Sequence, residues 1–405
     1  MRIGIFTECY KPVLNGVVNS IDGFRRGLIE LGHEVYIFCP NYKENINEKN
    51  IIRCNSIPFP GKSKYYYILP FNSRVTSIAR TMDIIHTQHP FTMASHAYKI
   101  AKNFNKPFLF TNHTQYEEYA HYAPFGKSLV RWYMKTYIKN FAQKCNMIIA
   151  PAQGIKDKLL SYNIKTPIKI VPNGIDLNRF KSQDKSFIRN KYKLNIWPTL
   201  VFVGRIAEEK NLTFLINAFR KVIEKYPNCY LLLVGGGPEE KHFHNLITIP
   251  HLVGEVSRLK DRVIITGFVP YKEIPNYLAS SDIFVSASKT EVHPLTVLEA
   301  MASGLPSVVF DTVGTGEIIE NGIDGIKTKT DNLNEYSDAI CELLRDNHKR
   351  QELGSTALEK SKKYSYLETS KIMEKIYQEV IEKNKDLSTS LDNTRDESLE
   401  TKEQA

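Results

Sequence analysis

Short apolar segments alternate with longer amphipathic segments along this 405-residue chain, and the alternation occurs twice. Apolar runs separated by segments with helical spacing are typical of strands joined by helices. The expected strands of the first half are Ile3–Phe6, Val35–Cys39, Asp83–His86, Phe108–Thr111, Met147–Ala150 and Ile168–Val171. Those of the second half are Thr199–Val203, Tyr230–Val234, Val263–Thr266, Ile283–Ser286 and Ser307–Phe310. The pattern predicts an α/β fold with two parallel sheets that helices cover on both faces.

The two halves meet at the turn-rich stretch Pro172-Asn173-Gly174. A chain of this length has room for about two domains of ordinary size. The expected segments are a first domain at 1–172, a second domain at 173–365, a helix at 366–383 that returns to the first domain, and a disordered tail at 384–405. The tail is expected to be disordered because it offers little but Leu387, Leu391 and Leu399 for burial.

Several features of the sequence argue against a membrane-spanning, secreted or disulfide-rich protein. No apolar run approaches the ~20 residues that span a bilayer. The apolar stretch after Met1 is too short for a signal peptide and is soon followed by Glu8. The six cysteines include no Cys-x-x-Cys pair, so we expect reduced thiols without disulfides or a zinc site. These features favour a cytoplasmic protein.

The excess positive charge lies in the first part of the chain. Residues 1–170 hold 23 Lys and Arg against 10 Asp and Glu, a balance of +13, whereas residues 171–405 balance at −3. This asymmetry favours an anionic partner, such as nucleic acid, an anionic membrane or a phosphorylated substrate. The alternative is that the charge serves solubility alone.

The segment Gly204–Asn211 places two cations after an expected strand. Arg205 and Lys210 lie five residues apart in a loop that ends where a helix begins. A guanidinium offers a planar pair of donors and an ammonium a mobile point charge, so together they suit a diphosphate. The alternative is that both cations pair with Glu208 and Glu209 on a solvated surface.

A second candidate segment, 288–306, follows the expected strand Ile283–Ser286. Pro294 suits the start of a helix, where free N–H groups can bind a phosphate. Glu291 precedes this helix and Glu299 lies inside it, eight residues later. A carboxylate can accept two hydroxyl protons from adjacent sugar carbons, so each residue can hold a different diol. The alternative is that Glu299 is an exposed helix residue.

Two weaker candidates follow expected strands of the first half. Asn15-Gly16 forms a turn before a helix, and a glycine there lets backbone N–H groups approach a phosphate. His113 directly follows a strand, although a lone histidine is more often structural. His86 and His89 have no accompanying cysteine or acidic cluster, so we expect no metal site.

These segments occur together with Asn15-Gly16-Val17-Val18 and with Pro172-Asn173-Gly174-Ile175-Asp176 followed by Phe180. Together they resemble the GT-B glycosyltransferases of the retaining family GT4, over about residues 1–380. The stretch 204–211 looks like the family's G-R-x-x-x-x-K diphosphate clamp, and Glu291 and Glu299 fit its E-x7-E motif. The resemblance implies two Rossmann-like domains whose parallel sheets face a central cleft.

Two segments look like bacterial diacylglycerol glucosyltransferases and related lipid mannosyltransferases. They are the runs Asn112–Tyr122 and Thr290–Thr296. Pro294 departs from the family, because many members carry glycine there and proline removes a backbone donor. The resemblance implies a nucleotide-sugar donor, with UDP-glucose favoured, and a lipid acceptor such as 1,2-diacylglycerol.

The resemblance also implies roles for the candidate residues. Arg205 and Lys210 would neutralise the leaving diphosphate, so that neither a metal nor another cofactor is required. Glu299 would hold the ribose and Glu291 the donor sugar, while His113 would hydrogen-bond near the reacting centre. The further residues implied for the nucleotide sugar are Gly16 at the phosphate, Phe268 and Val269 at the base, and His293, Leu295 and Thr296.

Two basic, aromatic segments lie in the positively charged half. One is a helix expected within 125–145, where cations recur at helical spacing and no acid occurs; the other is a loop at 61–70. The residues expected to contact a membrane or acceptor are Lys62, Lys64, Tyr65, Arg131, Trp132, Lys135 and Lys139. Such segments suit an anionic lipid surface, the alternative being a solvated helix with a packed aromatic face. No nucleic-acid-binding motif accompanies the charge, so we do not expect that partner.

The sequence therefore predicts a metal-independent, retaining hexosyltransferase that associates peripherally with the inner face of the cell membrane and forms an α-glycolipid. One alternative is a GT4 mannosyltransferase that uses GDP-mannose on a phosphatidylinositol-type lipid or a soluble sugar. A GT-B sugar-nucleotide epimerase and a non-catalytic membrane-binding module are the others. The pattern indicates no particular oligomeric state.

Overall fold

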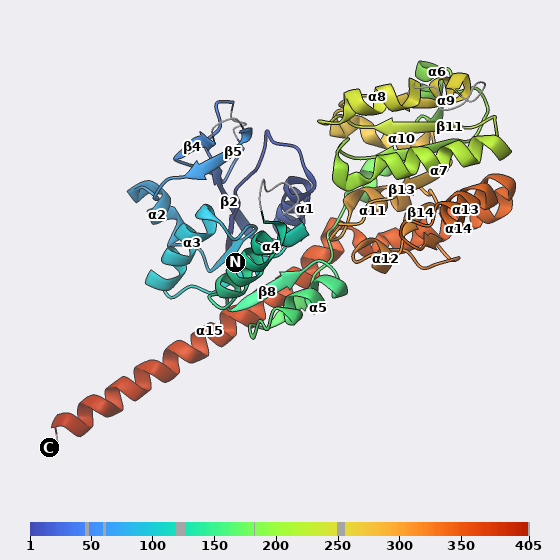
Figure 1. Ribbon diagram of the computed structural model, residues 1–405. Coiled ribbons are helices and arrows are strands. Elements are labelled where there is room, and N and C mark those ends of the chain that lie inside the picture. The colour runs from blue at the N-terminus through green and yellow to red at the C-terminus, as the bar shows by residue number, and fades with distance from the viewer. Residues whose placement is uncertain (45–47, 60–61, 119–125, 182, 249–255, 404–405) are drawn as a thin grey trace. The chain divides into compact units, whose positions relative to one another are not determined.

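The computed structural model divides the chain into two compact units (Figure 1). The structure describes the chain except residues 45–47, 60–61, 119–125, 182, 249–255 and 404–405. Unit 1 comprises Met1–Gly174 together with Tyr366–Ala405, and unit 2 comprises Ile175–Ser365. The chain therefore leaves unit 1, forms unit 2 and returns to unit 1.

Unit 1 contains a seven-stranded parallel sheet with the strand order β3-β2-β1-β6-β7-β8-β9. The strands are β1 (Arg2–Phe6), β2 (Glu34–Pro40), β3 (Ile51–Cys54), β6 (Ile84–Thr87), β7 (Phe108–Thr111), β8 (Met147–Ala150) and β9 (Ile168–Ile170). Side chains alternate between the two faces. Ile3 and Ile5 enter one core, whereas Phe6 stacks on the Phe38 ring at a centroid distance of 4.2 Å.

The helices of unit 1 are α1 (Gly16–Glu30), α2 (Ser73–Ala79), α3 (Thr92–Asn103), α4 (Lys127–Ala142), α5 (Gln153–Ser161) and α15 (Tyr366–Glu403). Asn15 caps α1, because its side chain accepts a hydrogen bond from the Val18 amide at 2.8 Å. Helices α1 and α15 pack closely at Gly27, where an added Cβ would lie 2.3 Å from Ser370 Oγ. The C-terminal helix α15 thus packs against α1 at a distance that only glycine at position 27 permits.

Unit 1 also contains an antiparallel hairpin formed by β4 (Ser56–Phe59) and β5 (Lys62–Ile68). The sequence analysis described 61–70 as a basic, aromatic loop, and this was wrong for Lys62–Ile68. The physical reason is the run of three tyrosines and an isoleucine at 65–68, since aromatic and β-branched residues favour strands.

Unit 2 contains a six-stranded parallel sheet with the order β12-β11-β10-β13-β14-β15. The strands are β10 (Thr199–Val203), β11 (Tyr230–Val234), β12 (Val263–Ile265), β13 (Ile283–Ser286), β14 (Ser307–Phe310) and β15 (Gly325–Thr328). Leu200 enters one core with Phe219 and Ile340, while Val201 enters another with Leu298. Helices therefore cover both faces, and the predicted α/β class with two Rossmann-like sheets is confirmed.

The α-helices in the described part of unit 2 are α6 (Lys185–Tyr192), α7 (Leu212–Lys225), α8 (Glu240–Thr248), α9 (Val256–Arg262), α10 (Ile274–Ala279), α11 (Leu295–Ala302), α12 (Thr315–Ile318), α13 (Leu333–Arg345) and α14 (Asn347–Ser361). Short 3-10 turns are η2 (Leu177–Phe180), η3 (Glu208–Lys210), η4 (Tyr271–Glu273) and η5 (Lys362–Tyr364). Three of these turns, η2, η3 and η4, follow the interdomain stretch or strands β10 and β12, and they carry residues of the candidate site.

The C-terminal segment differs from the sequence prediction. Residues 384–405 were expected to be a disordered tail, but α15 continues to Glu403. No glycine or proline occurs after Tyr366, so nothing in the local sequence interrupts the helix. Low apolar content predicts little packing, but it does not by itself prevent helix formation.

Candidate functional site

The carboxyl edge of the unit 2 sheet brings several glycine-rich loops together. Gly235 adopts a φ of +140°, and a Cβ there would lie 2.0 Å from the Gly204 carbonyl oxygen. A Cβ at Gly237 would lie 2.1 Å from the Ile206 carbonyl oxygen. The Ile206 amide donates to the Gly236 carbonyl at 3.1 Å. The loop after β11 therefore fixes the backbone on both sides of Arg205.

Arg205 lies in this loop with its side chain 52% exposed, and its guanidinium pairs with the carboxylate of Glu209. This pairing matches part of the surface alternative considered from the sequence. The Glu209 side chain is 5% exposed, so the carboxylate that orients Arg205 is buried. The arrangement leaves half of the guanidinium side chain accessible while its position is fixed.

Lys210 joins the first candidate segment to the second. Its ammonium lies 2.5 Å from Glu291 Oε1, although 81 residues separate the two in sequence. Two further bonds hold the segments together, since Ser288 Oγ donates to the Glu209 carbonyl at 3.2 Å and Asn211 Nδ2 to the Ala287 carbonyl at 3.2 Å. A cation and a carboxylate of the candidate set are thus in direct contact.

Gly314 closes the same edge from the loop after β14. It has a φ of +85°, and a Cβ there would lie 2.3 Å from the Val292 carbonyl oxygen and 2.8 Å from that of Glu291. A left-handed backbone with this close approach requires glycine. The backbone that carries Glu291 is therefore held from both sides.

Glu299 is buried rather than exposed, which contradicts the alternative considered from the sequence. Helix α11 begins after Pro294, and Glu299 is 2% exposed on it. Tyr271 donates its hydroxyl to Glu299 Oε1 at 2.8 Å. Burial raises the pKa of Glu299 to about 7, although the Tyr271 hydrogen bond and the charge of Arg179 lower it. A buried carboxylate whose pKa is raised by desolvation and lowered by specific partners marks a candidate functional site.

The other residues predicted in unit 2 differ in exposure. Phe268 is 69% exposed after β12, whereas Val269 is partly buried against the core. His293 and Leu295 are buried, and Thr296 is half-buried at the start of α11. Burial lowers the pKa of His293 to about 4, so this imidazole is neutral at physiological pH.

In unit 1, the carboxyl ends of β6 and β7 bring His113 to Gln88. His113 Nε2 lies 2.7 Å from Gln88 Oε1, within hydrogen-bond distance. Burial lowers the pKa of His113 well below its ordinary value, and the nearby His89 and His86 lower it further. His113 is therefore neutral and suited to hydrogen bonding rather than to acid catalysis.

Gly16 and His86 have simpler environments. Gly16 is exposed at the start of α1, and a Cβ there would meet no described atom within 4 Å. His86 is buried and bridges Tyr377 on α15 and Thr111 on β7, with both distances 2.7 Å. This confirms the structural interpretation of His86.

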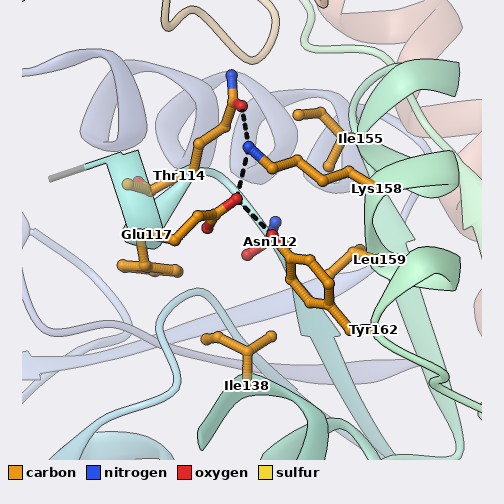
Figure 2. Close-up of a pocket in the computed structure, with 10 residues that line it drawn as sticks. Asn112, Thr114, Glu117, Ile138, Ile155, Lys158, Leu159 and Tyr162 are labelled. Carbon is orange, nitrogen blue, oxygen red and sulfur yellow. Dashed lines mark hydrogen bonds and ion pairs between the residues drawn. The ribbon is translucent and has the colours of Figure 1, made fainter. Parts of the chain in front are cut away.

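A partly buried ionic cluster anchors the segment that carries His113. Lys158 on α5 contacts Gln115 Oε1 at 2.6 Å, Glu117 Oε1 at 2.5 Å and Glu118 Oε1 at 3.2 Å. Tyr162 also donates its hydroxyl to Glu117. Figure 2 shows Lys158 and Tyr162 reaching Glu117 beside a small cavity. The sequence analysis missed this cluster, although two adjacent acids after a strand could have indicated it.

The sequence analysis also missed Glu8 and Gln88. Both come within two residues of the ends of strands of unit 1, at the edge where His113 lies. Glu8 accepts a hydrogen bond from the Met93 amide at 2.7 Å at the start of α3, and burial raises its pKa to about 7. Their positions after β1 and β6 were the available signal.

Helix α4 exposes an apolar stripe beside its cations. Leu129, Trp132 and Tyr133 are 67%, 63% and 57% exposed, at the i, i+3 and i+4 positions of one face. Arg131 and Lys135 are exposed and Lys139 is half-buried. Arg131 lies 3.6 Å from Glu118, so the helix contacts the ionic cluster. For Lys62, Lys64 and Tyr65 the structure describes the backbone of β5 only.

Among the described residues, no helix is both long and apolar enough to cross a membrane. The described residues also contain no group of three or more His, Cys, Asp or Glu side chains placed to hold a metal ion.

Two family models match most of the chain. The model for glycosyltransferase family 4 matches residues 14–179, and the model for group 1 glycosyl transferases matches residues 184–360. A relative from Acholeplasma laidlawii, alpha-monoglucosyldiacylglycerol synthase, is 30% identical over 95% of this chain and 98% of its own length. The chain belongs to glycosyltransferase family 4.

Further comparisons agree with this assignment. The alpha-monoglucosyldiacylglycerol synthase of Streptococcus pneumoniae is 30% identical over 80% of this chain and 74% of its own. The crystal structure of Anabaena HepE in complex with UDP-glucose has a TM-score of 0.72 and 18% identity, covering 94% of this chain and all of that one. The predicted GT-B fold and the membership of a hexosyltransferase family are confirmed.

Proposed function

We propose that this glycosyltransferase transfers glucose from UDP-glucose to 1,2-diacylglycerol and forms an α-glucosyl lipid. The observation that carries the proposal is the contact of Lys210 with Glu291 at the carboxyl edge of the unit 2 sheet, beside the accessible Arg205. This edge is where parallel α/β sheets bind ligands. Two relatives that align with most of the chain are named alpha-monoglucosyldiacylglycerol synthases, and this supports the choice of donor sugar and acceptor.

The proposed roles in unit 2 follow from charge and position. Arg205 and Lys210 stabilise the negative charge that develops on the departing diphosphate, without a metal. Glu291 accepts hydrogen bonds from hydroxyls of the donor sugar and Glu299 from those of the ribose. The residues proposed beside them are Phe268 and Val269 at the base, and His293, Leu295 and Thr296 at the donor sugar or phosphate.

The proposed roles in unit 1 are those of Gly16 and His113. The open space around Gly16 suits a phosphate approached by backbone amides. His113 donates or accepts a hydrogen bond near the reacting centre in its neutral form. The acceptor hydroxyl would transfer its proton to the departing phosphate on the same face of the sugar, which accounts for retention without an enzyme nucleophile.

We propose further that α4 docks on an anionic membrane surface at the inner face of the cell membrane. The exposed stripe of Leu129, Trp132 and Tyr133 supplies apolar and interfacial groups, and Arg131 and Lys135 supply charge beside it. An amphipathic helix of this kind binds lipid through buried apolar area and attraction to anionic headgroups. Hairpin β4–β5, whose Ile57 and Phe59 are exposed, is a second candidate contact.

The test is transfer from labelled UDP-glucose to phosphatidylglycerol liposomes that contain diacylglycerol. We expect a glucosyl lipid whose anomeric proton identifies the α-linkage, at a rate that chelators do not change. Liposomes without diacylglycerol are the control, and GDP-mannose with phosphatidylinositol liposomes is the competing arm. Turnover of a soluble acceptor without any lipid product would overturn the lipid assignment, and conversion of the nucleotide sugar without acceptor would indicate an epimerase.

A further inference from the structure

The buried carboxylate of Glu299 has a tyrosine partner from a different part of unit 2. Tyr271 begins η4, shortly after Phe268 and Val269, and donates its hydroxyl to Glu299 Oε1 at 2.8 Å. Glu299 lies on α11, which follows β13. The hydrogen bond therefore links the segment proposed for the base to the residue proposed for the ribose.

A third element holds the tyrosine. The guanidinium carbon of Arg179, on η2, lies 4.6 Å from the centroid of the Tyr271 ring. A guanidinium over an aromatic face is attracted by the negative face of the ring. The charge of Arg179 also lowers the pKa of Glu299. One cation therefore both orients the tyrosine and favours the ionised carboxylate.

An anionic Glu299 at 2% exposure needs hydrogen bonds to replace lost hydration. The Tyr271 hydroxyl supplies one such bond, and a carboxylate retains further lone pairs for a ligand. We propose that Tyr271 is a positioning residue that keeps the Glu299 carboxylate ionised and oriented for the two ribose hydroxyls of the nucleotide donor, with Arg179 holding Tyr271 in place. The inference rests on the proposed function, because it takes Glu299 as the ribose-binding residue.

The electrostatic surroundings give the proposal a pH dependence. Burial raises the pKa of Glu299 to about 7, while Tyr271 and Arg179 lower it. Other described elements also pack against α11. Asp176, beside η2, raises the pKa of Tyr271, and α10 carries no charged side chain. Neither Glu317 of α12 nor the charged residues of α14 shift the Glu299 pKa noticeably. Loss of the tyrosine hydroxyl should therefore raise this pKa further and protonate more of the carboxyl at pH 7.

The test compares Tyr271→Phe with a matched control, Tyr192→Phe. Tyr192 shares its hydroxyl with Tyr277 at 3.1 Å, so the control removes a hydroxyl of unit 2 that does not contact Glu299. Calorimetric titration of the full chain with UDP between pH 6 and 9 should show about tenfold weaker binding of Tyr271→Phe at pH 7, because a hydrogen bond to a charged group is lost. The deficit should shrink by pH 9, and Tyr192→Phe should match the wild type.

Pyrophosphate, which has no ribose, serves as the second probe and should bind the wild type and Tyr271→Phe equally. The donor-free protein gives an independent reading: infrared titration of the Glu299 carboxyl, identified against Glu299→Gln, should show a higher pKa in Tyr271→Phe. An unchanged carboxyl pKa, a UDP deficit that is constant across pH, or an equal deficit for pyrophosphate would each overturn the inference while leaving the proposed function intact. Absence of UDP binding by the wild type would overturn the proposed function together with the ribose role of Glu299.

Discussion

Burial in the Lys158 cluster predicts how much unfolding free energy the protein loses when the lysine is replaced. Lys158→Met keeps an unbranched side chain as far as the ε position but removes the cation that contacts Gln115, Glu117 and Glu118. The side chains of Lys158 and Glu117 are 24% and 7% exposed, so the variant leaves a carboxylate almost buried without its cation. Removal of one partner of a buried pair costs 3–5 kcal/mol, and since Tyr162 still donates to Glu117 we expect about 3 kcal/mol.

Urea unfolding followed by circular dichroism measures this loss. With a slope of about 3 kcal/mol/M, the midpoint of the unit 1 transition should fall by about 1 M. The two tryptophans lie in different units, so a Trp132→Phe background leaves Trp197 to report unit 2, whose midpoint should stay unchanged. Lys158→Met with Glu117→Gln removes both charges and should recover about 2 kcal/mol.

Two results would refute the reasoning about this cluster. A single variant that loses less than about 1 kcal/mol would show that the cluster behaves like a surface ion pair. A double variant as unstable as the single one would show that packing of the lysine stem, rather than the unpaired carboxylate, accounts for the loss.

Three further predictions concern the proposed site. Arg205→Ala should lower turnover by about 10³-fold or more with little change in circular dichroism, whereas Lys289→Ala, which removes an exposed cation paired with Asp331, should keep near-normal turnover. Reversal of Arg131, Lys135 and Lys139 to Glu should weaken sedimentation with anionic liposomes by about 10²-fold in a salt-dependent way, at about 1 kcal/mol per cation. The same reversal at Lys225, Lys241 and Lys289 should not, and equal binding of both triple variants would exclude α4 as the contact. Glu299→Gln should weaken UDP binding but stabilise the donor-free protein at pH 8. The pKa of Glu299 is higher in the folded protein than in the unfolded chain. Ionisation of Glu299 therefore opposes folding increasingly as the pH rises from about 4.5 to above 7. Thermal unfolding at pH 4 and pH 8 checks the sign, since the gain should disappear at pH 4.

The sequence predicted the central strands closely because each is a continuous apolar run buried on both faces. Phe108–Thr111 and Ile283–Ser286 have the predicted bounds. The edge strands β3 and β15 were not predicted, since Ile51–Cys54 and Gly325–Thr328 are short and mix apolar with polar or small residues. The other two edge strands, β9 and β12, were predicted to within one residue, so a position at the edge of a sheet does not by itself hide a strand from the sequence.

Candidate residues that directly follow strands could be predicted for a physical reason, because parallel strands place their carboxyl ends at one edge. Arg205 and His113 are examples. Their partners could not be predicted, since the contact of Lys210 with Glu291 joins positions 81 residues apart and that of Tyr271 with Glu299 joins positions 28 apart. Only tertiary structure decides which side chains meet across such separations.

The return of α15 to unit 1 has a consequence for synthesis on the ribosome. The sheet of unit 1 is translated first, but Tyr377, which bonds His86, and Ser370, which packs at Gly27, are translated only after all of unit 2. Domains ordinarily fold as units in the order in which they emerge. Here the first unit to emerge is the last to be completed, so its apolar face at α1 stays open to chaperones while unit 2 can already fold.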